Sequence, residues 1–234
     1  MSDTYAQVMR SADALEVAVA DPALVVFEAA ATAFRAGLDE LGEDFVIEDA
    51  PVPKRLAPHA TAVAVTVYRD DDDVASGRLI LLYDPAGQEA WAGTFRVVAY
   101  VRADIEPEVA ADPLLGEVGW SWLTEALDLH VPGYTAESGT VTRVITEGFG
   151  AKEEEVPLTG FELRASWSPT ADEQAQGEQA QGEHAQGEHA QGDLDALDLG
   201  SHVTAWCACI AAAAGLEPPG TRALRPRTPG SGQR

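Results

Sequence analysis

Three arginines and a tyrosine occupy matching positions in two stretches that alternate apolar and polar residues: Arg96, Tyr100, Arg102 and Arg164. Successive side chains of a β-strand point to opposite faces, so the first three would share one face of a single strand. Arg164 has the same phase in a second strand. Guanidinium groups bind carboxylates or phosphates through paired hydrogen bonds, and a tyrosine ring can stack against a cation. The pattern predicts a binding face for an anionic ligand or a protein partner.

A structural role is open to the same arginines. Cross-strand pairs between arginines and acids such as Glu162 commonly stabilise solvated sheet faces, and this is the more frequent outcome for charged strand residues. The binding hypothesis makes a distinct prediction. Replacing Arg96 and Arg102 by Glu should leave the fold intact and abolish capture of a partner.

No catalytic or metal-binding motif accompanies these residues. A nucleophile elbow, a phosphate-binding glycine loop, an H-E-x-x-H motif and a Cys/His zinc spacing are all lacking. His59, His130 and His202 each have a structural explanation and no sequence partner of the kind a general base needs. Cys207 and Cys209 would point to different sides of a helix, and we expect them to be core residues. We therefore expect no cofactor and no metal.

The composition is strongly acidic, with 39 Asp and Glu against 15 Lys and Arg and a formal net charge of −24. Such a charge repels nucleic acid phosphates and anionic lipid headgroups, which disfavours nucleic acid and membrane partners. The acidic run at 70–73 lacks the alternating ligands of an EF-hand loop and is expected at a solvated hairpin tip. With no evident signal peptide and no run of roughly 20 apolar residues, we expect a cytoplasmic protein without a spanning helix.

Regular strand patterns surround the arginines. An apolar run at 79–83 precedes Asp84-Pro85-Ala86-Gly87, a sequence typical of a type I turn, and alternation resumes at 91–103. Together they predict an antiparallel hairpin. Further strands are expected at 45–48, 62–68, 139–146 and 161–168.

Apolar residues that recur every three or four positions predict three helices. The first begins at Asp21-Pro22, a cap followed by a proline in the first turn, and ends at Gly42. The second begins with the same signal at Asp112-Pro113 and ends near 128. It is expected to bury four residues: Leu115, Val118, Trp122 and Ala126.

The third helix is expected at 198–215. Asp198 or Ser201 can cap its beginning, and Gly215 suits the position just past its end. Its buried stripe is expected to contain Val203, Trp206, Ile210 and Ala213.

Longer motifs run through these elements: D-P-A-G-Q-E-A-W-A-G-T-F-R at 84–96, A-A-D-P-L-L-G-E-V-G-W-S-W-L at 110–123, and the later G-T-V-T-R and E-L-R-A-S-W-S-P. On these motifs the chain resembles an uncharacterised actinobacterial family, the domain-of-unknown-function family number three thousand, over 22–169 and the last helix. The resemblance implies a bacterial, cytoplasmic protein. It brings no activity and no catalytic residue.

The predicted fold is α+β, with one antiparallel sheet of about five or six strands and three helices packed on one face. A flexible lead-in (1–20) precedes the domain (21–169). A disordered linker (170–193) then leads to the C-terminal helix of the same domain (194–216) and a disordered tail (217–234). The linker repeats E-Q-A-Q-G and E-H-A-Q-G, and it offers no large apolar residue whose burial could offset the entropy of folding.

These observations predict a non-catalytic interaction or regulatory protein that binds an anionic ligand or a protein partner on its sheet face. The alternative is a small hydrolase or transferase with a site assembled from scattered Asp, Glu, Arg and His residues. A deep pocket with convergent groups of perturbed pKa would favour the enzyme. A flat exposed patch would favour binding.

Overall fold

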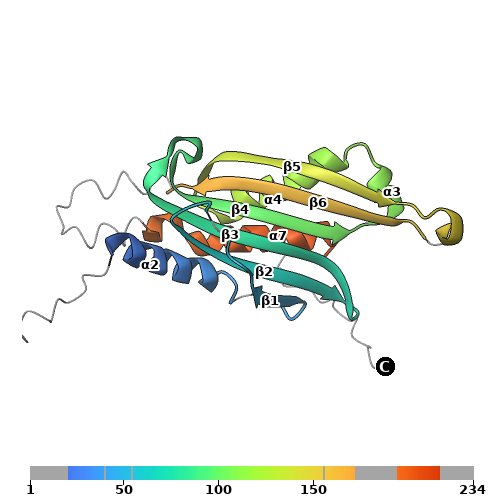
Figure 1. The fold of residues 1–234 in the computed structure, drawn as a ribbon, viewed down its shortest axis with the longest axis horizontal. Coiled ribbons are helices and arrows are strands. Elements are labelled where there is room, and N and C mark those ends of the chain that lie inside the picture. The colour runs from blue at the N-terminus through green and yellow to red at the C-terminus, as the bar shows by residue number, and fades with distance from the viewer. Residues whose placement is uncertain (1–20, 40, 54, 155, 172–193, 217–234) are drawn as a thin grey trace, which may run out of the picture.

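The computed structural model describes residues 21–39, 41–53, 55–154, 156–171 and 194–216 (Figure 1). Six antiparallel strands of this part form one sheet, in the order β1-β2-β3-β4-β6-β5. They are β1 (Phe45–Asp49), β2 (His59–Arg69), β3 (Asp72–Gln88), β4 (Gly93–Asp104), β5 (Tyr134–Thr146) and β6 (Leu158–Pro169). The predicted α+β class is confirmed. The expected lead-in, the repeat at 173–192 and the tail lie outside the described residues.

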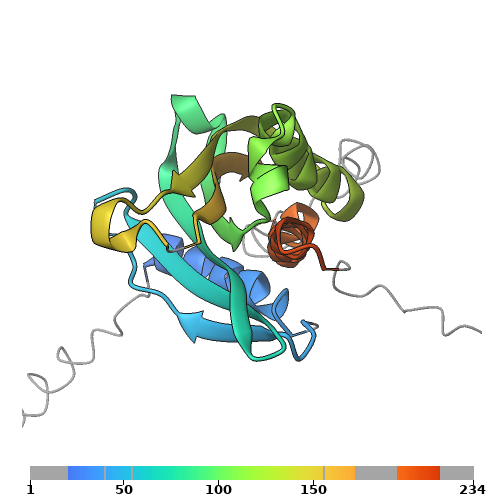
Figure 2. The ribbon, with the colours of Figure 1, turned by 90° about the vertical axis from the view of Figure 1, so that its right-hand side faces the viewer.

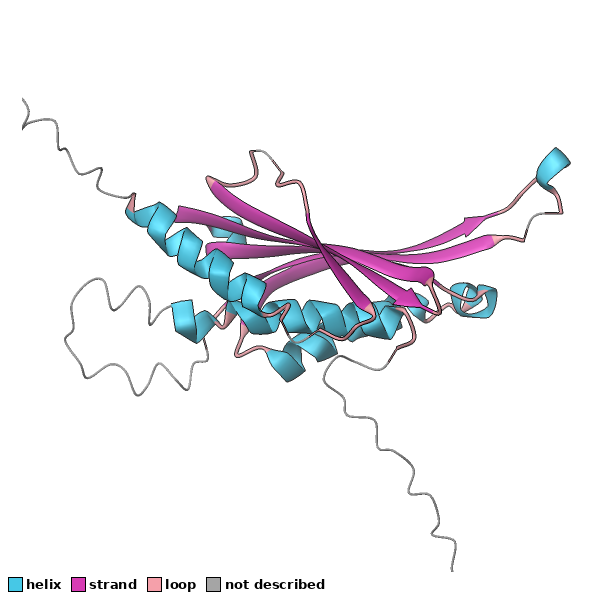
Figure 3. Cartoon of the chain, turned by 90° about the horizontal axis from the view of Figure 1, so that it is seen from below, coloured by secondary structure: helices cyan, strands magenta, loops and turns pink. Residues whose placement is uncertain are grey.

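Helices cover one face of this sheet, as predicted. The long ones are α2 (Pro22–Ala36), α4 (Leu115–His130) and α7 (Leu199–Ala213), and the short α3 (Pro107–Ala111) precedes α4. Figure 2 shows α7 (orange) end-on, with α4 (green) above it and α2 (blue) to its left and slightly lower. In Figure 3 the strands cross one another, which is the twist expected of a sheet of L-residues.

Strand alternation explains why only one face is covered. In each long central strand, every second residue is apolar and buried against the helices. Leu79 and Leu81 of β3, Val97 and Val101 of β4, and Leu163 of β6 are each fully buried. The intervening residues, which include the arginines, lie on the opposite face. We call that uncovered surface the open face.

α7 is the central element of the core. All four residues of its expected stripe are buried, and so are most of the others, because α2, α4 and the sheet surround it. Its end matches the prediction: Gly215 adopts a positive φ of 65°, and Leu216 N donates to the Ala211 carbonyl. Its beginning does not, since Asp198 makes no side-chain capping bond and Ser201 Oγ instead donates to the Asp198 carbonyl.

By length and composition alone, the helical stretch Leu194–Ala213 is apolar enough to cross a membrane. Most of it is buried inside the fold, which accounts for its apolar composition.

The first helix begins as predicted, with the Asp21 carboxylate accepting a hydrogen bond from Ala23 N and Pro22 in the first turn. The predicted end of this helix was wrong: α2 stops at Ala36, and Gly37 rather than Gly42 is its C-cap. Close packing explains the difference. A Cβ on Gly37 would lie 2.2 Å from the Gly200 carbonyl oxygen, so this glycine lets α2 meet the start of α7.

The second helix begins later than predicted. Asp112 does not cap it; its carboxylate accepts from Leu114 N in a turn between α3 and α4. The buried face is rotated as well, because Val118 is exposed and Trp122 only partly buried, edge-on to Phe161. Gly119 takes the position against the sheet. A Cβ there would lie 2.3 Å from the Phe161 ring.

The predicted hairpin of β3 and β4 exists, but its turn was misplaced. β3 continues through 84–87, where the Asp84 carboxylate accepts from Ala86 N, and the chain reverses at the short 3-10 helix Glu89–Trp91 and Ala92. The prediction that the acidic run forms the hairpin tip between β2 and β3 was correct. Asp70 and Asp71 have φ values of 52° and 70°, which suit a tight hairpin turn.

Candidate functional site

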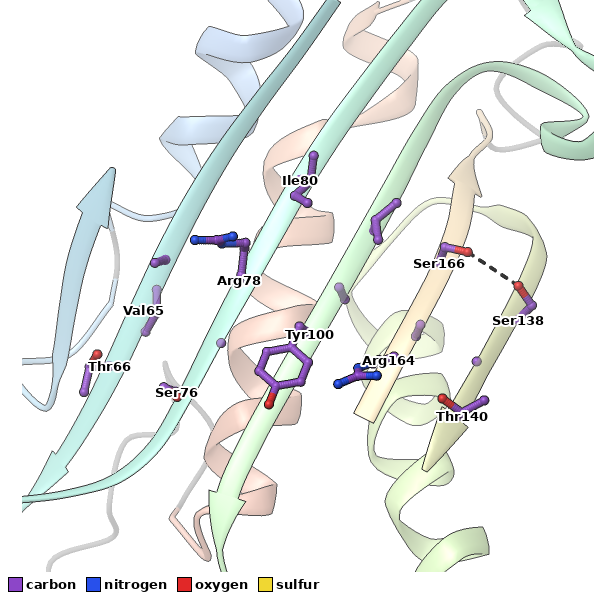
Figure 4. Close-up of a pocket in the computed structure, with 16 residues that line it drawn as sticks. Val65, Thr66, Ser76, Arg78, Ile80, Tyr100, Ser138, Thr140, Arg164 and Ser166 are labelled. Carbon is purple, nitrogen blue, oxygen red and sulfur yellow. Dashed lines mark hydrogen bonds between the residues drawn. The ribbon is translucent and has the colours of Figure 1, made fainter. Parts of the chain in front are cut away.

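A cavity of about 930 Å³ lies on the open face, over the middle of β2, β3, β4, β6 and β5 (Figure 4). Apolar groups such as Ile80 and Val98 supply part of its wall, and hydroxyls and two arginines supply the polar part. The volume suits a small organic molecule.

The centre of the cavity is a row of three residues on adjacent strands. Arg78 of β3 lies directly opposite Tyr100 of β4, which lies directly opposite Arg164 of β6. Strand spacing separates the two arginines by about 9–10 Å at the backbone, so both side chains can reach an anion placed over the tyrosine. In Figure 4 the Arg164 side chain points toward Tyr100, whereas that of Arg78 turns toward β2.

Tyr100 and Arg164 are already associated. The guanidinium carbon of Arg164 lies 5.5 Å from the centre of the Tyr100 ring, a cation–π distance. Glu162 contacts both residues. It pairs with Arg164 at 3.2 Å, and burial, together with the charge and hydrogen bond of Glu162, raises the pKa of Tyr100. The Arg164 side chain is 68% exposed, so this pair is weak and leaves the guanidinium accessible.

Arg78 differs from Arg164 in having no partner. It is exposed, and among the described residues it makes no hydrogen bond, ion pair or ring contact. The two arginines are the only charged residues of the described chain that line the cavity. The lining therefore carries two positive charges in a chain with a net charge of −24, and Glu162, which is not part of the lining, partly offsets that of Arg164.

Arg96 shares the open face but is not exposed. Only 7% of it is accessible, and its guanidinium donates to Ser168 Oγ at 3.1 Å, Ser166 Oγ at 2.8 Å and Ser138 Oγ at 3.5 Å. Burial lowers the pKa of Arg96, and the charge of Glu137 opposes this shift. Arg96 therefore cannot offer its guanidinium to a large partner in the way the sequence suggested.

Arg102 lies outside the cavity. It pairs with Asp104 at 3.6 Å on its own strand and lies opposite Glu162 in the register. Arg102 and Arg164 thus pair with acids, but each pair lies along one strand and not across strands as the structural alternative predicted. Of the four residues expected in the site, the cavity brings together Tyr100 and Arg164.

The polar residues of the cavity that were not predicted include Arg78, Ser138 and Ser166. A signal for Arg78 was present, because it precedes Leu79 and Leu81 in strict alternation and so must face away from the helices. Ser138 and Ser166 carried no comparable signal, since serine is common on any solvated strand.

Among the described residues, neither the histidines (His59, His130 and His202) nor the two cysteines line this cavity. Cys207 and Cys209 are buried in α7, and burial raises the pKa of both thiols, that of Cys209 to about 12. The part of the chain that the structure describes contains no group of three or more His, Cys, Asp and Glu residues that could hold a metal ion.

Most of the chain, and not only the cavity, matches a known protein family. A family model described as a protein of unknown function (DUF3000) matches residues 24–222. No curated protein and no solved structure matches the chain.

Proposed function

The chain belongs to the DUF3000 family of proteins of unknown function, and from its open face we propose that it is a non-catalytic protein that binds a small anionic ligand. One observation carries the proposal. A cavity of about 930 Å³ has two arginines as its only charged lining residues within the described chain, and they flank a tyrosine in a strongly acidic protein.

The wall of the cavity supports a ligand that is partly apolar. Ile80 and Val98 lie opposite each other on β3 and β4, each two residues along its strand from the row of Arg78, Tyr100 and Arg164. A carboxylate or phosphate could bind the guanidinium groups while an attached hydrocarbon covers these side chains. A bare inorganic anion would leave them uncovered.

A small molecule fits this face better than a protein partner does. The hollow is sized for a ligand of low molecular mass, and Arg96 and Arg102 are committed to partners of their own. Catalysis has less support than binding. The described lining residues supply cations and hydroxyls but no His, Asp, Glu or Cys, the side chains that most often act as a general base or an activated nucleophile.

Titration calorimetry with heptanoate tests the proposal, because this probe combines a carboxylate with an apolar chain. Arg164→Gln and Arg78→Gln should each weaken binding about tenfold, since each removes a charge-assisted hydrogen bond. Arg143→Gln is the matched control: this arginine lies on β5 outside the cavity, where it bonds the Asp112 carbonyl. Equal affinity of the parent and the Arg78/Arg164 double variant, or no binding to the parent, would refute the proposal.

A further inference from the structure

Arg96 is a buried cation whose charge is not balanced by a contacting acid. Its three hydrogen-bond partners, Ser138, Ser166 and Ser168, are neutral hydroxyls. Within the described residues, no carboxylate lies at ion-pair distance from it, and Glu137 acts on it only through its field. Buried charges are normally paired, because the loss of hydration is otherwise uncompensated.

Two of these serines connect Arg96 to the cavity. Ser138 and Ser166 both line it, and their oxygens lie 3.4 Å apart (Figure 4). Each oxygen accepts a hydrogen bond from Arg96, which leaves its own proton free to be donated. At most one of the two protons is used between the serines. At least one O–H group, polarised by the cation behind it, therefore remains for an acceptor in the cavity.

The serine pair lies close to the arginine row. Ser166 and Arg164 are two residues apart on β6, so they share the open face at a separation of about 7 Å. Ser138 lies opposite Ser166 on β5, and Val98 lies opposite it on β4. A ligand held at Arg164 thus meets a second polar group at the next position on this face of β6, with the apolar side chain of Val98 beside it.

We propose that Ser138 and Ser166, backed by the buried Arg96, form a second anion subsite, so that the cavity takes an elongated molecule with an acidic group at each end. The inference rests on the proposed function, because the first acidic group is the one held by Arg78 and Arg164. It narrows the ligand class to compounds such as α,ω-dicarboxylates with an apolar middle.

The test compares pimelate with heptanoate by calorimetry on the full chain. The two probes have the same carbon chain, and only pimelate carries a second carboxylate, at roughly the separation of the two subsites. The parent should bind pimelate at least about tenfold more tightly. The double variant Ser138→Ala with Ser166→Ala should bind the two probes equally and keep its affinity for heptanoate. Ser76→Ala is the control, because Ser76 lines the cavity without contacting Arg96.

The outcomes separate this inference from the proposed function. If heptanoate binds through Arg164 but pimelate gains nothing, or if the double serine variant keeps the preference for pimelate, the second subsite does not exist. If neither probe binds, both ideas fail. Should the double variant not fold, the single variant Ser138→Ala replaces it, because Ser138 is exposed. This variant must reduce the preference for pimelate over heptanoate, and an unchanged preference would overturn the inference.

Discussion

His202 makes the stability of the fold depend on pH. Its side chain is fully buried in α7, where Nδ1 accepts a hydrogen bond from the Trp167 indole N–H at 3.0 Å. The imidazole must therefore carry its proton on Nε2, which has no well-formed hydrogen bond among the described residues. Burial lowers the pKa of His202 to about 4, and the Leu197 backbone opposes the shift only in part.

The sign of the effect follows from the two states. The unfolded chain takes up a proton on this histidine near the ordinary pKa of 6.5, and the folded chain only near 4. Between these values protons bind the unfolded state preferentially, so stability is full above about pH 6.5 and is lost as the pH falls. At 1.36 kcal/mol per unit of pKa, lowering the pH from about 7.5 to about 5.0 should remove about 2 kcal/mol through this group.

Urea denaturation across that pH range measures the loss. His202→Asn is the comparison variant, because asparagine keeps an acceptor for Trp167 and does not titrate. The carboxylates act in both proteins, so the difference between the two pH profiles isolates the histidine. The parent should lose about 2 kcal/mol more than the variant. Parallel profiles, or an NMR titration of the folded parent that places His202 near 6.5, would refute the reasoning.

Two further predictions concern packing. Gly119→Ala should lower the free energy of unfolding by about 1–3 kcal/mol, because its Cβ would overlap the Phe161 ring. Gly116→Ala on the same helix has open space around its Cβ and should raise the free energy of unfolding by up to about 1 kcal/mol. Urea denaturation measures both, and equal changes in stability would contradict this packing. Cys207 and Cys209 should be inert to a thiol reagent in the folded protein and react at once in denaturant, and fast labelling of the native protein would show that α7 opens readily.

The fold was largely predictable because its signals are local. Alternation of large apolar residues located the long strands, and Asp21 with Pro22 marked the start of α2. The wrong predictions concern positions at which tertiary contacts determine the local structure. Gly119 looked like a weak point of a helix, and only the nearby Phe161 ring shows that α4 needs a glycine there.

The candidate site was predictable only in part, for a different reason. Strand phase correctly assigned Arg96, Tyr100, Arg102 and Arg164 to one face. Strand phase does not show how deeply a side chain is buried, however. The buried position of Arg96 depends on the serines that neighbouring strands place around it, and that arrangement follows from the register of β4, β6 and β5.

The central claim is that an anion binds over Tyr100 between Arg78 and Arg164. Proton–nitrogen NMR of the arginine side chains during a heptanoate titration tests it most directly, because each guanidinium reports its own contacts. The Nε–H signals of Arg78 and Arg164 should shift and saturate together, while those of Arg35 and Arg143, which lie away from the cavity, should stay in place. Shifts that spare Arg78 and Arg164, or that affect all arginines alike, would contradict the claim.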